Sequence, residues 1–354
     1  MSSGRLPSRR QLMQRGNFTP PRASQLDTCL FPQIRFECMK AFLAALAFLC
    51  TPARSPAADR PAPDWPPSQA ALPVIIDADA ANEVDDQYAL ALALGFPERI
   101  NLIGFVAAHF GDKGGSTGID KSFAEIQTVL DKAGKAGQYP IKRGSDPITY
   151  RDRVPPSEGV DFIIEQALKA TPENPLWLVL LGPATDAAAA LAKEPRIAGR
   201  LVVFWHGRTQ WPLRAWNFNA YNDIKAVQMI FEAPVRMVLF DTGTYLRLTM
   251  DESIQRFAPI GPLGAYLHEI RNRHPHYASP TKGFFDLGDI AALVDSNTVR
   301  WERTAAPRVD HDLRYDFTRN HGEILRIYHV ERDRTFELLE QALRRLAGVG
   351  PEKP

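Results

Sequence analysis

The stretch VIIDADAANEVDDQYALALALG, Val74 to Gly95, decides the fold of this chain and gives the first indication of its function. It opens with a short apolar, β-branched run, which predicts a buried strand whose carboxyl end leads into a loop. From Asp85 the spacing becomes helical, with acids in the first turn and Gly95 as a stop, so a helix is predicted there. Five acidic residues gather within ten positions where strand gives way to helix: Asp77, Asp79, Glu83, Asp85 and Asp86.

Apolar runs and helical patterns alternate along the rest of the chain. Further strands are predicted at 100–111, 139–146, 175–182, 200–207, 235–241 and 323–330, and helices at 122–134, 159–171, 185–194, 223–233, 262–273, 287–295 and 335–348. This alternation predicts an α/β fold with a mostly parallel central sheet and helices on both faces. In such open sheets ligands bind beyond the carboxyl ends of the strands, which is where the acids lie.

The net charge of +1 conceals a division of the chain. Residues 1–58 carry a balance of +6, which leaves −5 for the remainder. A mildly acidic folded part gives no support for binding to nucleic acid, so no nucleic-acid partner is predicted. The hydrophobic content of 45% is ordinary for a globular protein with a sizeable core.

The segment MKAFLAALAFLCTPARSPAAD, from Met39, has the layout of a secretory signal peptide: a lysine, a short apolar run and then small residues. The run is too short to span a bilayer, and cleavage after Ala57 or Ala58 suits the small-residue rule. We therefore predict an exported protein, periplasmic or extracellular, without stable membrane insertion after cleavage. Two other interpretations stay open: a basic tail before a membrane-associated helix, and a lipoprotein anchored through Cys50.

This interpretation divides the chain into four parts. Residues 1–38 are predicted to be a mis-called extension or a disordered tail, 39–58 the signal peptide, 59–72 a proline-rich linker, and 73–348 the folded domain. All three cysteines precede the expected cleavage site. The mature chain is therefore predicted to have neither disulfides nor thiol chemistry.

The clustered acids require an explanation, because neighbouring carboxylates cannot all ionise cheaply. A hard cation such as Ca²⁺ or Mg²⁺ resolves the repulsion, since these ions prefer carboxylate and carbonyl oxygens. A purely structural alternative is that Asp85 and Asp86 favour the positive end of a helix, while Asp77 and Asp79 form turns. That alternative explains one or two acids better than the whole group, so a metal is favoured. A phosphoryl-transferring aspartate is a further alternative, weakened by Ala81 where Thr or Val is usual.

Five segments, in order, resemble the inosine–uridine preferring nucleoside hydrolases. The opening stretch is similar to the family's metal-binding D-x-D-P-G-x-D-D motif, but the longer spacing between Asp79 and Asp85 resembles a divergent branch. The others are RGSDPI, VDFIIEQAL with LWLVLLGPATDAAAAL, AWNFNAYNDIKAVQMIF, and FFDLGDIAALVD. The resemblance covers nearly the whole domain, and implies the family's fold, Ca²⁺ as cofactor and a small-molecule nucleoside as substrate. It also allows a homo-oligomer.

The resemblance implies a catalytic base and a set of metal ligands. Asp79 matches the base, which also contacts the metal. Asp86 and Asp286 match the other metal carboxylates. Leu181 matches a position whose backbone carbonyl is a ligand, so the side chain there need not be polar.

The resemblance also implies contacts to the sugar, and here the chain departs from the family. Asp85 matches a contact to the ribose hydroxyls, and Asn219 matches a ribose-binding asparagine. Asn217 replaces a glutamate that contacts the sugar. Phe285 stands where some members carry a histidine that protonates the leaving group, so that acid is not identified.

Histidines and aromatic residues near predicted strand ends are secondary candidates. His109 and His206 follow predicted strands, and for both a packing or surface role is favoured over a role in the pocket. Four aromatic residues are candidates to stack on a base, with a core or rim position as the alternative for each: Trp205, Trp211, Trp216 and Phe285.

Together these features predict calcium-dependent hydrolysis of the N-glycosidic bond of a ribonucleoside or related N-riboside, giving free ribose and base. Two alternatives stay open. One is an exported nucleoside- or sugar-binding protein of the same fold without turnover, favoured by Asn217 and Phe285. The other is a hydrolase of a different glycosylated substrate.

Overall fold

The computed structural model describes residues 60–243, 245–273 and 278–350. The predicted N-terminal extension and signal peptide, residues 1–58, lie outside the described residues. Within the described ranges no helix combines the length and the apolar character needed to cross a membrane.

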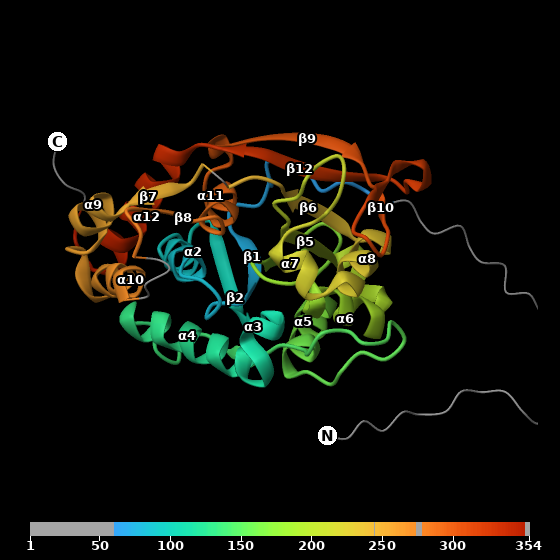
Figure 1. Ribbon diagram of the computed structural model, residues 1–354, viewed down its shortest axis with the longest axis horizontal. Helices are drawn as coiled ribbons and strands as arrows, with labels where there is room; N and C mark the ends of the chain where they lie inside the picture. The colour runs from blue at the N-terminus through green and yellow to red at the C-terminus, as the bar shows by residue number, and fades with distance from the viewer. Residues whose placement is uncertain (1–59, 244, 274–277, 351–354) are drawn as a thin grey trace, which may run out of the picture. The chain divides into compact units, whose positions relative to one another are not determined.

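The domain is built on an eight-stranded sheet with the order β3-β2-β1-β4-β5-β6-β12-β9 (Figure 1). All neighbouring strands run parallel except β9, which runs antiparallel to β12. The strands in this order are Ile141–Arg143, Ile100–Ala107, Leu72–Ala78, Leu176–Leu180, Leu201–His206, Arg236–Phe240, Glu323–Val330 and Val299–Ala305. The predicted mostly parallel sheet is confirmed. The edge strand β9 was not predicted, because most of its side chains are exposed and its sequence, VRWERTA, lacks an apolar run.

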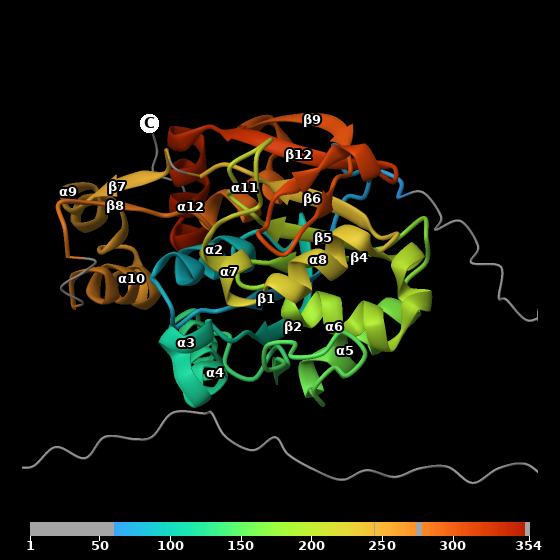
Figure 2. The ribbon, with the colours of Figure 1, turned by 45° about the vertical axis from the view of Figure 1, so that its right-hand side comes forward.

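Helices cover both faces of the sheet, as predicted (Figure 2). Successive residues of β1 point to opposite faces, so Val74 and Ile76 join one hydrophobic cluster while Ile75 joins the other. The first cluster contains side chains of α2 (Asp85–Leu94), α4 (Gly118–Lys132), α10 (Gly261–Arg273), α11 (Leu287–Val294) and α12 (Arg332–Leu346). The second contains side chains of α5 (Glu158–Lys169), α6 (Thr185–Lys193) and α8 (Ile224–Glu232).

Several short elements complete the domain. Three helices are short, with three to five residues each: α3 (Gly111–Gly114), α7 (Phe218–Asn222) and α9 (Met250–Glu252). Two small antiparallel pairs are formed by β7 (Arg247–Thr249) with β8 (Thr281–Gly283), and by β10 (Arg308–Val309) with β11 (Tyr315–Asp316).

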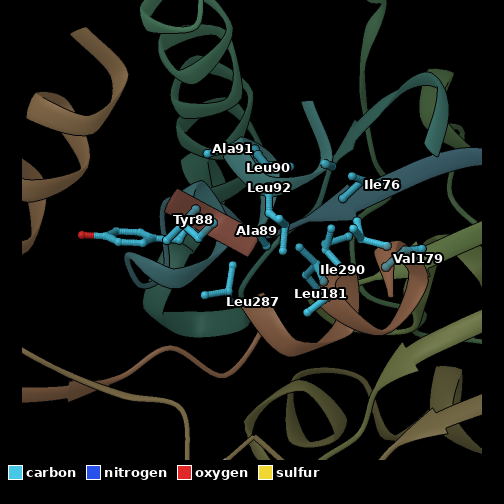
Figure 3. Packing of buried hydrophobic residues seen from close by; sticks show 14 of the residues in the cluster. Ile76, Tyr88, Ala89, Leu90, Ala91, Leu92, Val179, Leu181, Leu287 and Ile290 are labelled. Atoms are coloured by element: carbon cyan, nitrogen blue, oxygen red, sulfur yellow. The ribbon is translucent and has the colours of Figure 1, made fainter. Parts of the chain in front are cut away.

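Helix α2 is enclosed on all sides, and all ten of its residues are buried. Its apolar side chains pack with Ile76 of β1, Val179 of β4, and Leu287 and Ile290 of α11 (Figure 3). After its first turn α2 is apolar on every side, and such a helix is stable only inside a core. Because α2 is fixed in this way, the acids in its first turn are held rigidly against the sheet.

The segment from Arg60, predicted as part of a linker, lies against the domain. The Arg60 guanidinium donates to the carbonyl oxygens of Ala233, at 2.7 Å, and Ile230. The Trp65 ring lies 6.3 Å from the ring centroids of both Trp177 and Phe204. This part of the chain therefore contributes to the core before β1 begins.

The close approach of α2 to α12 makes a stability prediction. A Cβ added at Gly95 would lie 2.3 Å from Cβ and 2.4 Å from Cα of Ala342. Gly95→Ala should therefore lower the free energy of unfolding by about 1–3 kcal/mol, measured by urea denaturation. Gly199→Ala is the matched control, because nothing lies within 4 Å of its added Cβ. Equal stability of the two variants would contradict this account of the contact.

Candidate active site

The site lies where the strand order reverses. From β1 the chain continues to β2 and β3 on one side, whereas β4, β5 and β6 follow on the other. Such a switch point leaves a crevice at the carboxyl ends of the two central strands. An open pocket of about 440 Å³ lies here, lined by Asp79, Asn82, Glu83, Asp85, Asp86, Leu181, His206, Arg208, Asn217, Phe218, Asn219, Phe285 and Asp286.

All seven residues singled out in the sequence line this one pocket: Asp79, Asp85, Asp86, Leu181, Asn217, Asn219 and Asp286. They come from four separate segments: the end of β1 with the start of α2, the end of β4, the start of α7, and the residue before α11. The fold thus brings together residues up to about two hundred positions apart, although their individual roles remain predictions.

Asp79 is buried and is positioned by its neighbours. The Asn82 amide donates to Asp79 Oδ2 at 3.0 Å. A Cβ added at Gly182 would lie 3.1 Å from both Cβ and Cγ of Asp79, so a larger residue there would press on this carboxylate. Burial, followed by the charge of Asp85, raises the pKa of Asp79 to about 8. A carboxylate with so high a pKa is a much stronger proton acceptor than an exposed aspartate.

Three buried carboxylates converge beside Asp79. Asp85, Asp86 and Asp286 each offer an oxygen, and these oxygens lie within 4.8 Å of one another. Asp86 Oδ1 is buried without a hydrogen-bond partner among the described residues. Burial and then neighbouring carboxylates raise the pKa of both Asp86 and Asp286 well above the ordinary value. A hard cation fits this donor set, because it would coordinate the unpartnered Asp86 Oδ1 and neutralise the negative charge of the three carboxylates.

The two asparagines mainly organise the pocket wall. Asn219 Nδ2 donates to the Leu181 carbonyl at 2.7 Å, which fixes the oxygen predicted as a metal ligand. Asn217 Oδ1 accepts from the Ala220 amide at 2.9 Å, and its Nδ2 donates to the Gly207 carbonyl. Asn217 therefore caps α7 and holds the loop after β5.

His206 differs from the packing histidine favoured by the sequence. It lines the pocket, and its Nδ1 lies 2.7 Å from Asp289 Oδ2 and 3.4 Å from Asp286 Oδ1. His109, in contrast, is not among the residues that line this pocket, and its Nε2 lies 2.7 Å from Thr185 Oγ1. Both histidines lie at the carboxyl end of a strand, His109 just after β2 and His206 at the end of β5, with β1 and β4 between them. The sequence offered no signal that separates the two.

Sequence reasoning also missed a buried lysine beside the acids. Lys282 Nζ donates to Glu83 Oε2 at 2.8 Å and lies 3.5 Å from Asp85 Oδ1. The Phe285 amide donates to Asp85 Oδ2 at 2.9 Å. Lys282 and Glu83 are 199 positions apart, so only the folded chain reveals this pair.

The candidate stacking residues fall in different places. Phe285 lines the pocket, together with Phe218, which the sequence did not indicate. Trp205 is fully buried and donates to the Gly182 carbonyl, Trp211 packs against Tyr315 and Phe317, and Trp216 is about half exposed. None of the three tryptophans is among the lining residues.

Comparisons with known proteins identify the family and support the fold. The profile of the family described as inosine-uridine preferring nucleoside hydrolase matches residues 74–333. A pyrimidine-specific ribonucleoside hydrolase, RihA of Klebsiella pneumoniae, is 28% identical over 261 residues, or 65% of this chain and 79% of that protein. Among solved structures, a plant nucleoside hydrolase has a TM-score of 0.62 at 19% identity, covering 76% of this chain and 98% of its own. A purine-preferring ribonucleoside hydrolase from Gardnerella vaginalis has a TM-score of 0.61 at 22% identity, covering 77% and 98%.

The fold and the family match define a hydrolase that acts on N-glycosyl compounds. The chain belongs to the inosine-uridine preferring nucleoside hydrolase family, because the profile match spans most of the folded domain. Its reaction class is the hydrolysis of the N-glycosidic bond of ribonucleosides. The family depends on a metal ion, and the carboxylates of this pocket are suited to hold one.

The buried carboxyls predict an unusual pH dependence of stability in metal-free protein. Asp79 has a pKa of about 8 and Asp186 of about 7, against an ordinary 3.8, and burial is the main cause of both shifts. Between the unfolded and folded pKa values the folded state holds protons that the unfolded chain has lost. The free energy of unfolding therefore decreases as the pH rises from about 4 to about 8.

We expect the melting temperature in chelator to be lower at about pH 8 than at about pH 5.5, and calcium to raise it more at the higher pH. Asp79→Asn removes one titrating group, so its metal-free melting temperature should fall less between these pH values. If the melting temperature of the wild-type protein in chelator rose with pH, the buried carboxyls would not have the raised pKa values on which this prediction rests.

Proposed function

We propose that this protein is a calcium-dependent hydrolase that converts ribonucleosides to free ribose and base. The convergence of Asp79 with Asp85, Asp86 and Asp286 in one pocket carries the proposal. When bound, calcium supplies a Lewis acid that lowers the pKa of water and orients vicinal hydroxyl groups. Asp86 and Asp286 would hold it together with Asp79 and the carbonyl of Leu181. Asp85, whose oxygen lies within 4.8 Å of those of Asp86 and Asp286, is engaged instead by the Phe285 amide and Lys282.

Asp79 acts as the general base. It accepts a proton from the water that attacks the anomeric carbon. Burial raises its pKa to about 8 in the metal-free protein, and a bound cation would favour the ionised form that a base requires. As the glycosidic bond breaks, positive charge develops on the ribosyl ring, as in the oxocarbenium-like transition states of glycosidases. The buried carboxylates around the ring would stabilise that charge.

Asp85 and Asn219 are the proposed ribose contacts. Asp85 is held in place by the Phe285 amide and by Lys282, so its carboxylate is oriented before substrate arrives. Such preorganisation reduces the entropy lost on binding. Asn217 contributes indirectly, because its side chain is engaged by the Gly207 and Ala220 backbone.

Release of ribose from purine and pyrimidine nucleosides tests the proposal, using protein from Asp59 onward with calcium or with chelator. Wild-type protein should release ribose only in the presence of calcium. Asp79→Ala should lower kcat by roughly 10²- to 10⁴-fold, the range for a lost general base, without unfolding the domain. Asp86→Ala should in addition weaken calcium affinity, measured by calorimetry.

Asp131→Ala is the control, because Asp131 is exposed on α4 and away from the lining residues. Full activity of Asp79→Ala would overturn the mechanism. Calcium binding by wild type without release of ribose from any nucleoside would instead favour a binding protein, or a hydrolase of another glycosylated compound.

We also propose that the protein is exported. The support is the sequence pattern from Met39 and the absence of cysteine after Cys50. Expression of the full gene product in a bacterial host should give periplasmic or extracellular protein whose N-terminus, by Edman or mass-spectrometric sequencing, is Ala58 or Asp59. Mature protein that retained Met39 and stayed with the cytosol would refute export.

A further inference from the structure

Arg208 occupies an unusual backbone position at the rim of the pocket. It is the second residue after β5, and its φ is +20°, a rare value for a residue with a side chain. The amides of Gly207 and Arg208 both donate to the carbonyl of Phe240, at 3.0 and 2.9 Å. These two hydrogen bonds fix the backbone where the chain leaves β5, and so set the direction in which the Arg208 side chain begins.

The side chain of Arg208 lies on an aromatic wall of the same pocket. Its guanidinium carbon is 3.9 Å from the ring centroid of Phe285, and both residues line the pocket. A guanidinium at this distance stacks on the ring and keeps its N–H groups at its edge.

Among the described residues, no carboxylate forms an ion pair with Arg208, and its guanidinium makes no hydrogen bond. Lys282, the other cation near this phenylalanine, is engaged instead by Glu83 and Asp85. Arg208 thus offers a planar set of donors, held in position by a ring, to whatever enters the pocket.

The reaction needs such a group. When the bond from C1′ to the base nitrogen breaks, its electron pair goes to that nitrogen, and the base leaves with negative charge unless something protonates or stabilises it. The carboxylates of the pocket cannot help while ionised, and His206 has its Nδ1 turned to Asp289 beside the metal-binding group. Arg208 is the remaining cation among the residues that line the pocket.

We propose that Arg208 is the leaving-group residue of this enzyme. Its guanidinium donates hydrogen bonds to acceptor atoms of the base and stabilises the negative charge as the glycosidic bond breaks, and solvent then protonates the released base. Oriented donors aimed at developing charge act in this way in other enzymes. The inference rests on the proposed hydrolysis of ribonucleosides and adds to it a catalytic residue for the departing base.

Substrates with different leaving groups test the inference. Nucleosides need assistance to expel the base, whereas p-nitrophenyl β-D-ribofuranoside releases a phenolate that is stable on its own. Arg208→Met keeps the length of the side chain and removes its donors and charge. It should lower kcat for nucleosides by about 10²-fold, the usual cost of one lost donor, and leave kcat for the p-nitrophenyl riboside unchanged. Arg208→Lys should recover part of the loss.

Arg214→Met is the matched control. Arg214 belongs to the same loop and stacks on Trp216, but it does not line the pocket, so both substrates should be cleaved normally. Activity of Arg208→Met on the p-nitrophenyl riboside also shows that the variant is folded.

The outcomes separate the inference from the proposed function. An equal loss on both substrates would mean that Arg208 supports the fold or balances the acids, and would overturn the inference while hydrolysis stands. Unchanged cleavage of nucleosides by Arg208→Met would overturn it as well. Failure of wild-type protein to cleave either substrate would refute the proposed function, and the inference with it.

Discussion

The structure depends on one costly arrangement, the burial of several carboxylates at the carboxyl end of β1. Burial raises the pKa of Asp79, Asp86 and Asp286, and also that of Asp77, whose two side-chain oxygens have no hydrogen-bond partner among the described residues. Such groups destabilise a fold unless charge or hydrogen bonds compensate. The first turn of α2 supplies part of that compensation through its helix dipole, and a bound cation would supply the rest.

The rest of the fold keeps these carboxylates together. Helix α2 is buried on every side and cannot rotate or shift without disrupting the core. The glycines at 95 and 182 permit two close approaches, of α12 to the end of α2 and of β4 to Asp79. The hydrogen bond from Asn219 to the Leu181 carbonyl then joins the start of α7 to the end of β4. The packing of the core thus holds together a group of carboxylates that destabilises the fold when no cation neutralises its charge.

Sequence patterns predicted the parallel sheet and the pocket because both follow from local signals. An apolar run ending in acids specifies a strand, its direction and the position of its carboxyl end. Strand β9 escaped prediction because an exposed edge strand needs no apolar pattern. Two side-chain pairs were not predicted, because their members lie 83 and 199 positions apart in the sequence: His206 with Asp289, and Lys282 with Glu83. The role of Arg208 was not predicted, because the direction of its side chain depends on the two backbone hydrogen bonds to the Phe240 carbonyl, which no pattern in the sequence encodes.

The pocket combines groups of opposite charge in a way that matches the polarity of the bond to be broken. In hydrolysis of an N-riboside the sugar becomes positive and the base becomes negative, so a single uniform charge cannot stabilise both. Four aspartates surround the position proposed for the ribose, and burial strengthens their effect by lowering the local dielectric. Arg208, stacked on Phe285, brings the opposite charge into the same pocket. A histidine at position 285 could have protonated the departing base. With a phenylalanine there, the ring instead supports a cation that stays charged at every physiological pH, and the proton comes from solvent.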